Sequence, residues 1–163
     1  MIIALISFPS ASFSSSSTND LEIGLSMINN DEYESAIIQF TTIIAEESEN
    51  AEAYNLRGVS KAKRGDFKGA IYDYDKSLEL NSQNIDVYSN RGIAKARSGD
   101  LNGAISDFDK VTEMDGTNPV AYFNHAISME MSNQLDKACI DWKKASDLGD
   151  KRADVFISKN CKK

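Results

Sequence analysis

Apolar and small residues recur at helical spacing through the middle of the chain. Residues 51–84 carry two such stripes, and two residues that favour a turn, Gly65 and Asp66, stand between them. The stripes consist of Tyr54, Gly58 and Ala62, and then of Ala70, Ile71, Tyr74 and Leu78. Steps of three or four residues are typical of helices that bury one face. Glycine can end the first helix in a left-handed turn and Asp66 can cap the second. This stretch is therefore predicted to be a pair of amphipathic helices.

The same pattern returns in the next 34 residues. Residues 85–118 follow residues 51–84 without a gap, and 15 of the 34 aligned positions are identical. The period extends back to residues 17–50, where Asp20 replaces the first aromatic residue, and forward to residues 119–152, where Ala126 replaces the glycine. A helical pair repeated at a fixed period predicts an array of stacked units that share one continuous core.

The unit resembles the tetratricopeptide repeat, a helix–turn–helix of 34 residues. The residues that match its pattern are Tyr54, Gly58, Ala70, Tyr74 and Ser77 in one unit, and Tyr88, Gly92, Ala104 and Phe108 in the next. The resemblance implies an all-α fold, a right-handed α-solenoid of helix–turn–helix repeats. It implies a single domain over residues 19–161, with units at 17–50, 51–84, 85–118 and 119–152.

The resemblance also implies a place for a partner. In tetratricopeptide arrays the first helix of each unit lines a concave groove, and six positions of the unit face a bound peptide or protein. Carried over to this chain, the expected groove residues are Asn55, Val59, Lys63, Ser89, Asn90, Ile93, Arg97, Phe123, Asn124, Ile127, Glu130 and Met131. Amides can pair with the backbone of an extended peptide, and the apolar residues can form pockets. The alternative for each residue is a solvated helix face.

One subtype of the family is not matched. Its members hold a C-terminal carboxylate in a clamp of cations and asparagines, and of that clamp only Asn90 is present in units two to four. The positions that need a cation hold Asn55, Val120 and Asn124. We therefore do not expect a C-terminal carboxylate held in this way.

A cation and a carboxylate recur together in three units. Position 7 and position 23 hold Arg57 with Asp73, Arg91 with Asp107, and His125 with Asp141. In the first unit the same positions hold Ile23 and Gln39. Because the two positions lie on the two packed helices of one unit, we expect partly buried structural ion pairs that hold those helices in register. The alternative is that Arg57 and Arg91 point into the groove and hold a ligand carboxylate.

The charge of the chain is uneven. The net charge is −7, yet residues 1–50 contain eight Asp or Glu and no Lys or Arg, while the rest carries 18 basic and 17 acidic residues. Nucleic-acid binding needs a basic field, so no nucleic acid is expected as a partner. The acidic end is interpreted as a solvated face that aids solubility, with a patch for a basic partner as the alternative.

The first residues resemble an export signal. Residues 1–12 contain a short apolar run followed by small residues, which is typical of the core and cleavage region of a secretory signal peptide. No basic flank precedes the run, so the alternative is a partly apolar tail. If these residues are a signal peptide, the protein is periplasmic, lumenal or secreted. If they are not, the protein is expected in the cytoplasm. Residues 13–18 are interpreted as a serine-rich linker, with ordered structure from Asn19 or Asp20.

A capping helix is expected at about residues 150–161. Gly149 can end the preceding helix, and Ala153, Phe156 and Ile157 follow at helical spacing, as a closing helix with a polar outer face requires. If this helix folds back, Cys161 approaches Cys139. A disulfide would suit an exported protein, and two free thiols are the alternative.

Residues suited to chemistry are sparse. There is one histidine, no glycine-rich phosphate loop, and the 22-residue spacing of the two cysteines does not suit a metal site. The sequence thus predicts a protein without catalytic activity, cofactor, metal or membrane span. The first functional hypothesis is an interaction scaffold that binds a protein or peptide in its groove. The second is a structural subunit of an exported or envelope-associated assembly, or of a homo-oligomer, which uses its outer face.

Overall fold

The computed structural model describes residues 15–161, and all of its regular structure in this range is helical. The predicted signal peptide at residues 1–12 lies outside the described range. The chain forms nine α-helices here, in the order α1 (Ser15–Asn29), α2 (Tyr33–Glu46), α3 (Ala51–Lys63), α4 (Phe67–Leu80), α5 (Ile85–Ser98), α6 (Leu101–Met114), α7 (Pro119–Met131), α8 (Leu135–Asp147) and α9 (Arg152–Asn160).

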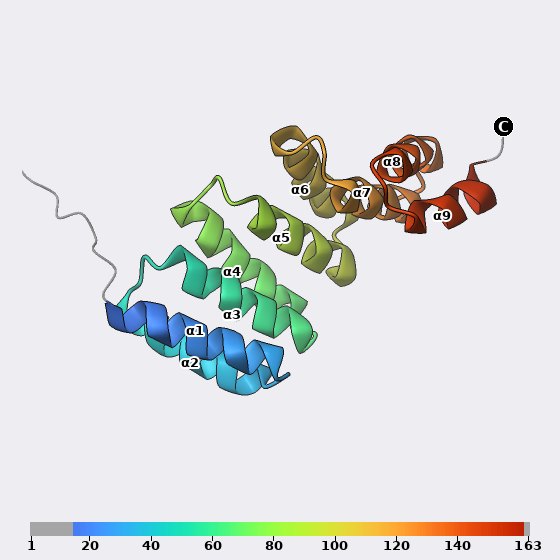
Figure 1. Ribbon diagram of the computed structural model, residues 1–163. Coiled ribbons are helices and arrows are strands. Elements are labelled where there is room, and N and C mark those ends of the chain that lie inside the picture. Colours follow the sequence, from blue (N-terminus) through green and yellow to red (C-terminus); the bar gives the residue numbers. More distant parts are fainter. Residues whose placement is uncertain (1–14, 162–163) are drawn as a thin grey trace, which may run out of the picture.

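Successive helices pair into four hairpins, and α9 follows them. The units pair α1 with α2, α3 with α4, α5 with α6, and α7 with α8. Each second helix also packs on the first helix of the following unit, and α8 packs on α9. Figure 1 shows the result, an elongated array that runs from α1 and α2 at one end to α9 at the other. The first helices of neighbouring units touch one another, so α1, α3, α5 and α7 form one layer.

Capping side chains and turn residues with left-handed backbone set the ends of these helices. Asp66 accepts a hydrogen bond from the backbone N–H of Gly69 at 2.9 Å and so caps α4, and Asp100 does the same for Gly103 and α6. The turn inside each unit needs a left-handed residue. Gly65 has φ of 86° there and Gly99 has φ of 92°, while Asp31 and Asn133 take this role in the outer units.

Each unit is held together by an aromatic side chain that packs against a residue almost without a side chain. In the second unit Tyr74, 1% exposed, lies against Gly58, where an added Cβ would stand 2.8 Å from the ring. In the fourth unit Trp142 is fully buried and Ala126 replaces the glycine. The close approach explains why glycine and an aromatic residue recur sixteen positions apart.

One boundary differs from the sequence-based expectation. Helix α1 begins at Ser15, inside the stretch interpreted as a serine-rich linker at residues 13–18, and not at Asn19 or Asp20. Serine is only mildly unfavourable in a helix, and residues 21–28 supply an apolar face that packs on α2. A favourable helix can therefore extend backwards through the serines. The capping helix agrees closely with its predicted position, since α9 spans Arg152–Asn160.

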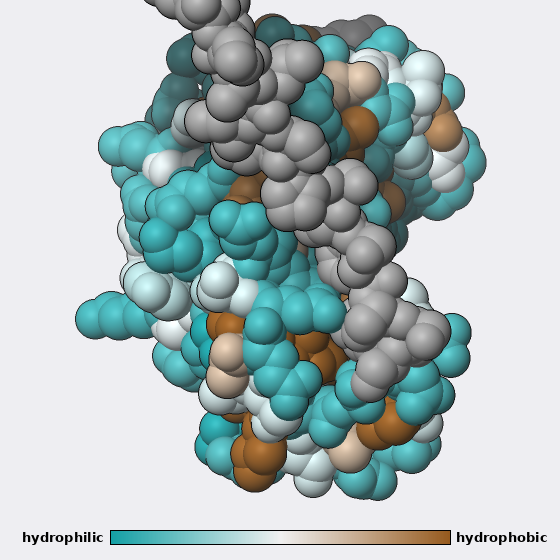
Figure 2. Space-filling view, turned by 90° about the vertical axis from the view of Figure 1, so that its left-hand side faces the viewer, coloured by the Kyte–Doolittle hydropathy of each residue, from teal (hydrophilic) through white to brown (hydrophobic). Residues whose placement is uncertain are grey.

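The face at the N-terminal end is largely polar. Figure 2 views the molecule from the side where α1 and α2 lie and shows a mainly hydrophilic surface with small, separate hydrophobic patches. Among the described residues, no helix combines the length and the apolar character that crossing a bilayer would need.

Candidate functional site

Two adjoining pockets lie along the layer of first helices, and we call them together the inner groove. The first pocket measures about 450 Å³ and lies between α3, α4 and α5. The second measures about 250 Å³ and lies between α5, α6 and α7. Ile93 and Arg97 of α5 line both pockets, so they form the boundary between them. The groove therefore spans the second, third and fourth units.

Eight of the twelve expected groove residues line these pockets. They are Val59, Lys63, Asn90, Ile93, Arg97, Asn124, Ile127 and Met131. They come from positions 6, 9 and 13 of their units, so one helix face repeats along the array. Asn90 and Asn124 share position 6 and stand one repeat apart, as donors and acceptors that follow an extended segment would.

The other four expected residues do not line the pockets. Asn55 is 7% exposed and Phe123 is 9% exposed, so neither side chain is open to the groove in this structure, contrary to expectation. Glu130 accepts a hydrogen bond from the side chain of Asn160 at 2.8 Å. Ser89 is half-buried outside both pockets. Position within the repeat alone does not tell whether a neighbouring element covers a side chain.

Helix α9 is what covers Phe123. The ring of Phe156 meets that of Phe123 edge to face, with centroids 5.4 Å apart. The guanidinium of Arg152 also lies over the Phe123 ring, 4.3 Å from its centroid. The capping helix takes the place that the first helix of a fifth unit would take. It therefore keeps Phe123 from being open to the groove.

Sequence reasoning missed the floor of the groove. Phe67 and Tyr74 of α4 line the first pocket, and Phe108 of α6 lines the second. Tyr74 and Phe108 are the core aromatic residues of their units, and their rings reach the groove between the first helices. Burial, and secondarily the nearby Asp73 charge, raises the pKa of the Tyr74 phenol above its usual range. The signal available in the sequence was the aromatic residue at position 24.

The groove has two basic residues and no acidic one. Lys63 and Arg97 line it, and no Asp or Glu is among the lining residues of either pocket. The guanidinium of Arg97 lies over the ring of Phe67, 5.4 Å from its centroid. Neither Lys63 nor Arg97 forms an ion pair with a described residue. Both charges are therefore available to a ligand.

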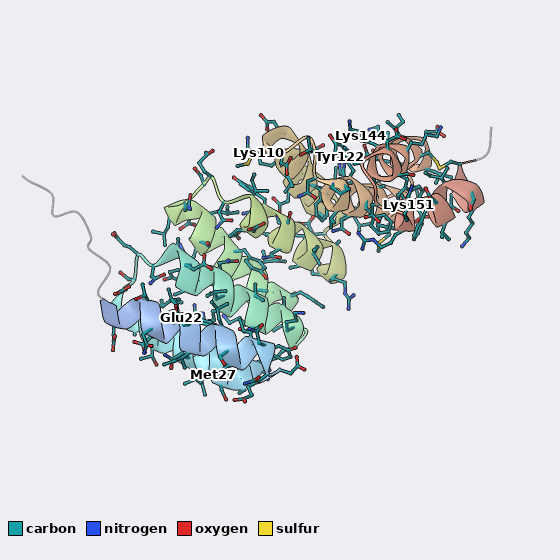
Figure 3. The ribbon with its side chains drawn as sticks, in the orientation of Figure 1. Glu22, Met27, Lys110, Tyr122, Lys144 and Lys151 are labelled. Atoms are coloured by element: carbon teal, nitrogen blue, oxygen red, sulfur yellow. A yellow bond between two sulfur atoms is a disulfide. The ribbon has the colours of Figure 1, made fainter. Side chains whose placement is uncertain are left out.

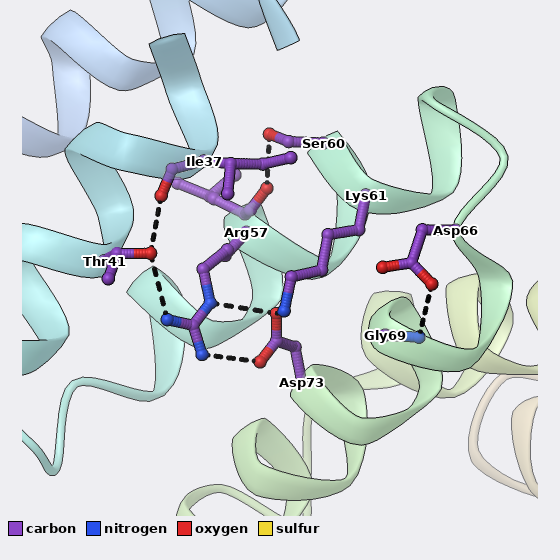
Figure 4. Close-up of polar contacts among 9 residues, drawn as sticks. Ile37, Thr41, Arg57, Ser60, Lys61, Asp66, Gly69 and Asp73 are labelled. Carbon is purple, nitrogen blue, oxygen red and sulfur yellow. Dashed lines mark hydrogen bonds and ion pairs between the residues drawn. The ribbon is translucent and has the colours of Figure 1, made fainter. Parts of the chain in front are cut away.

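The other recurrent cations are occupied within the array. Arg57 holds Asp73 through two hydrogen bonds, from Nε to Oδ2 at 2.9 Å and from Nη2 to Oδ1 at 2.7 Å. Lys61 meets the same carboxylate at 2.7 Å, and Thr41 of the preceding unit accepts a third bond from Arg57. Figure 4 shows this cluster between α3 and α4, with Thr41 beside it. Asp73 is fully buried, so these partners replace its water.

The third unit repeats the cluster and extends it. Arg91 pairs with Asp107 in the same two-bond geometry, and its Nη1 donates to Asp75 of the preceding unit at 2.7 Å. Although burial opposes its charge, the hydrogen bonds and charges of Asp107 and Asp75 raise the pKa of Arg91. The guanidinium thus joins the two helices of its own unit and also links that unit to its neighbour. The contacts leave no carboxylate-holding role in the groove for Arg57 and Arg91.

The fourth unit has a weaker version. His125 Nδ1 lies 2.9 Å from Asp141 Oδ2, and its Nε2 lies 3.4 Å from Asp109 Oδ1 of the preceding unit. Nε2 makes no hydrogen bond within the described range, although the side chain is only 6% exposed. The shorter imidazole reaches the same two carboxylate positions as arginine does, but with one good contact instead of three.

The end of the array is tied down by α9. Cys139 of α8 and Cys161 after α9 stand with Cα atoms 5.6 Å apart, and the structure joins their sulfur atoms. Phe156 packs on Trp142 with ring centroids 5.0 Å apart. Among the residues described, no cluster of His, Cys, Asp and Glu is arranged to hold a metal ion.

Comparison with known proteins agrees with this architecture. A family model described as the TPR repeat matches residues 60–99. No curated protein sequence matches the chain. Solved structures do: a crystal structure of MamA has a TM-score of 0.78 at 22% identity, covering 84% of this chain and 80% of its own. MamA from Desulfovibrio magneticus RS-1 gives 0.79 at 19% identity, covering 85% and 78%.

A third structure is YrrB, described as a TPR protein with an unusual peptide-binding site. Its TM-score is 0.79 at 24% identity, and the match covers 90% of this chain and 76% of YrrB. These identities show a shared fold. Together with the repeat and the helices described here they confirm an all-α, right-handed solenoid. The part of the chain that the structure describes thus has the fold of a tetratricopeptide-repeat array, with four helix–turn–helix units and a capping helix, and its residues 60–99 match the TPR repeat itself.

Proposed function

We propose that this protein is a non-catalytic interaction scaffold that binds an extended segment of a partner protein in the inner groove. The observation that carries the proposal is the pair of adjoining pockets, whose open lining repeats from unit to unit. Val59, Ile93 and Ile127 offer apolar contact at one repeat position. Asn90 and Asn124 offer amides at another, so side chains and backbone of an extended chain can both be satisfied.

The fold supports the same proposal. Tetratricopeptide arrays expose a long curved surface because each unit contacts only its neighbours. YrrB, which shares this fold, is described as having a peptide-binding site. The groove extends over three units. A segment of several residues fits these dimensions better than a small compact ligand.

Selection from a random library of displayed 12-residue peptides tests the proposal. The full chain is immobilised, and enriched peptides are measured against the wild type and against the double variant Asn90→Ala, Asn124→Ala. Each lost hydrogen bond contributes about 0.5–1.5 kcal/mol, so binding should weaken about tenfold. Phe123 is left unchanged, because its substitution would disturb the packing of α9.

The matched control replaces two amides outside the pockets, Gln83→Ala and Asn102→Ala. Both residues are exposed. The control should bind the selected peptides as the wild type does. Equal binding by the groove variant, or the absence of any enriched peptide, would contradict the proposal.

Export remains part of the proposal and rests on the sequence of residues 1–12 and on the joined cysteines. Disulfides persist mainly in oxidising compartments. Mass spectrometry of the protein isolated from its source would measure the mature N-terminus. Cleavage after the apolar run is expected, and an intact first residue would argue for the cytoplasm.

A structural subunit is the second candidate function, and one observation favours it. Ile38, Tyr72 and Ile140 share repeat position 22 on the second helices and are 57–68% exposed. A second copy that covers this row would make the protein a homo-oligomer. Sedimentation velocity distinguishes the candidates: a monomer contradicts the homo-oligomer, and a species that dissociates in Ile38→Lys supports it.

A further inference from the structure

Eight of the 16 Lys and Arg residues in the described range are already paired with carboxylates. Those with such a partner are Arg57, Lys61, Arg64, Lys76, Arg91, Lys95, Lys110 and Arg152. Lys63 and Arg97 are different, because they line the inner groove and pair with no carboxylate of the described residues. They share repeat position 13, at the last turn of α3 and of α5.

The cation of α5 is held in place before any ligand arrives. The guanidinium of Arg97 rests over the ring of Phe67 at 5.4 Å, which limits its rotation and leaves its N–H groups free. Arg97 also lines both pockets. A carboxylate bound there would lie at the boundary between them, within the reach of a planar fork that suits carboxylate oxygens.

Apolar surface stands on both sides of this charge. The first pocket has Val59, Phe67 and Ile93, and the second has Ile127 and Met131 with Ile93 between them. Neither pocket is lined by a carboxylate that could neutralise Lys63 or Arg97 internally. The groove thus presents apolar surface in each pocket, with Arg97 at the boundary between the pockets and Lys63 in the lining of the first.

The net charge of −7 would repel an acidic ligand, but the residues responsible for it lie away from the groove. Eight of the acidic residues fall in residues 1–50, and the rest of the chain is nearly neutral. In Figure 3, Glu22 lies on α1 at one end of the array, and Lys144 and Lys151 lie toward the other end. At physiological ionic strength exposed charges are screened over about 8 Å. The local charge of Lys63 and Arg97 therefore outweighs that of the first unit.

We infer that the inner groove selects an acidic segment of a partner protein, in which an Asp or Glu beside Lys63 and Arg97 is flanked by two large apolar side chains seated in the two pockets. This inference rests on the proposed function, since it names the chemistry of the segment that the groove binds. It differs from a carboxylate clamp, because the cations stand at position 13 and the carboxylate is a side chain within the segment.

The same displayed library tests this chemistry. The pool selected on the wild type is compared with the pool selected on the double variant Lys63→Glu, Arg97→Glu. Wild-type peptides should be enriched in Asp or Glu between aliphatic or aromatic residues, and should bind the variant at least about tenfold more weakly. The variant should in turn enrich Lys or Arg at the same place. An unfolded variant would not give that reversed preference.

Matched controls separate local from general charge. Lys68→Glu with Lys143→Glu makes the same change of net charge at two exposed residues outside the pockets, and should leave the affinity unchanged. The single variant Lys63→Glu keeps the contact of Arg97 with Phe67. It replaces the double variant in the experiment if circular dichroism shows that the double variant has lost its helices. It should still weaken binding several-fold, and added salt should weaken wild-type binding.

The outcomes distinguish this inference from the proposed function. Peptides that need Asn90 and Asn124 but show no acidic preference would overturn the inference and leave groove binding intact. Acidic peptides that bind the charge-reversed and wild-type proteins equally would also overturn it. A library that yields no groove-dependent peptide would overturn both.

Discussion

At the scale of residues, a buried carboxylate is the feature with the largest energetic consequence. Asp73 is fully buried, and it exchanges water for two bonds from Arg57 and a contact with Lys61. The free energy of removing such a charge from water is offset only while its hydrogen-bonding and charged partners are present. The cluster is therefore expected to hold α3 and α4 in one register.

A double-mutant cycle on Arg57→Ala and Asp73→Ala measures this coupling. Each single change is expected to lower the free energy of unfolding by about 3–5 kcal/mol, because it leaves the other charge without its main partner. The double variant should lose clearly less than the sum. Urea unfolding at neutral pH gives the four free energies.

The exposed pair Lys76 and Glu79 on α4 is the control for this cycle. Its side chains are 38% and 61% exposed, and such pairs contribute at most about 0.5 kcal/mol. A coupling between Arg57 and Asp73 no larger than this would contradict a structural role for the recurrent ion pair.

At the scale of elements, the approach of two helices depends on a missing side chain. At Gly58 an added Cβ would lie 2.8 Å from the Tyr74 ring. Gly58→Ala should therefore push α3 away from α4 and lower the free energy of unfolding by about 1–3 kcal/mol. Thermal unfolding followed by circular dichroism measures the effect.

Gly116→Ala is the matched control for this change. Gly116 lies between α6 and α7, and an added Cβ there meets nothing nearer than 3.7 Å. Its effect on stability should be within about 0.5 kcal/mol. Equal losses at the two glycines would show that helix approach is not what Gly58 provides.

The joint between α8 and α9 makes a second prediction at this scale. Cys139 and Cys161 are 22 residues apart. A crosslink over such a loop lowers the entropy of the unfolded chain and so raises the free energy of unfolding by about 3 kcal/mol. Cys161→Ser, or reduction of the wild type, should lower stability by roughly this amount. Under oxidising conditions a denatured sample should show no thiol that reacts with maleimide. Two reactive thiols would contradict the bridge.

At the scale of the whole molecule, stability should vary along the array. The first unit has Ile23 and Gln39 where later units have the ion pair, and within the described range it packs on one other unit, the second. In a linear array each unit depends on its neighbours, so end units open first. Hydrogen exchange of backbone amides should therefore be faster in α1 and α2 than in α5 and α6.

The fourth unit is the comparison within the same molecule. It also stands near an end, but α9 covers it through Phe156 and the joined cysteines. Its amides should exchange more slowly than those of the first unit and should become faster after reduction. Equal protection in all four units would contradict this gradient.

Individual residues show how much of the site could be predicted from the sequence. Val59, Ile93 and Ile127 were predictable as groove residues, because their repeat position fixes the helix face they occupy. Asn55 and Phe123 occupy faces that the same rule assigns to the groove, yet both are buried. The bond from Arg91 to Asp75 of the preceding unit could not be read from pairs within one unit.

The sequence by itself determined the helical pair, its turn and its repetition, because these depend on contacts within 34 residues. Three features act locally: a glycine opposite an aromatic residue, a capping aspartate and an apolar period of 3.6 residues. They therefore repeat in every unit whose sequence repeats them. The tertiary structure decided which repeated positions stay open. Exposure depends on the neighbouring unit, on α9, and on which carboxylates reach each cation, and these contacts exist only once the units stack. The same stacking leaves Lys63 and Arg97 unpaired in the groove.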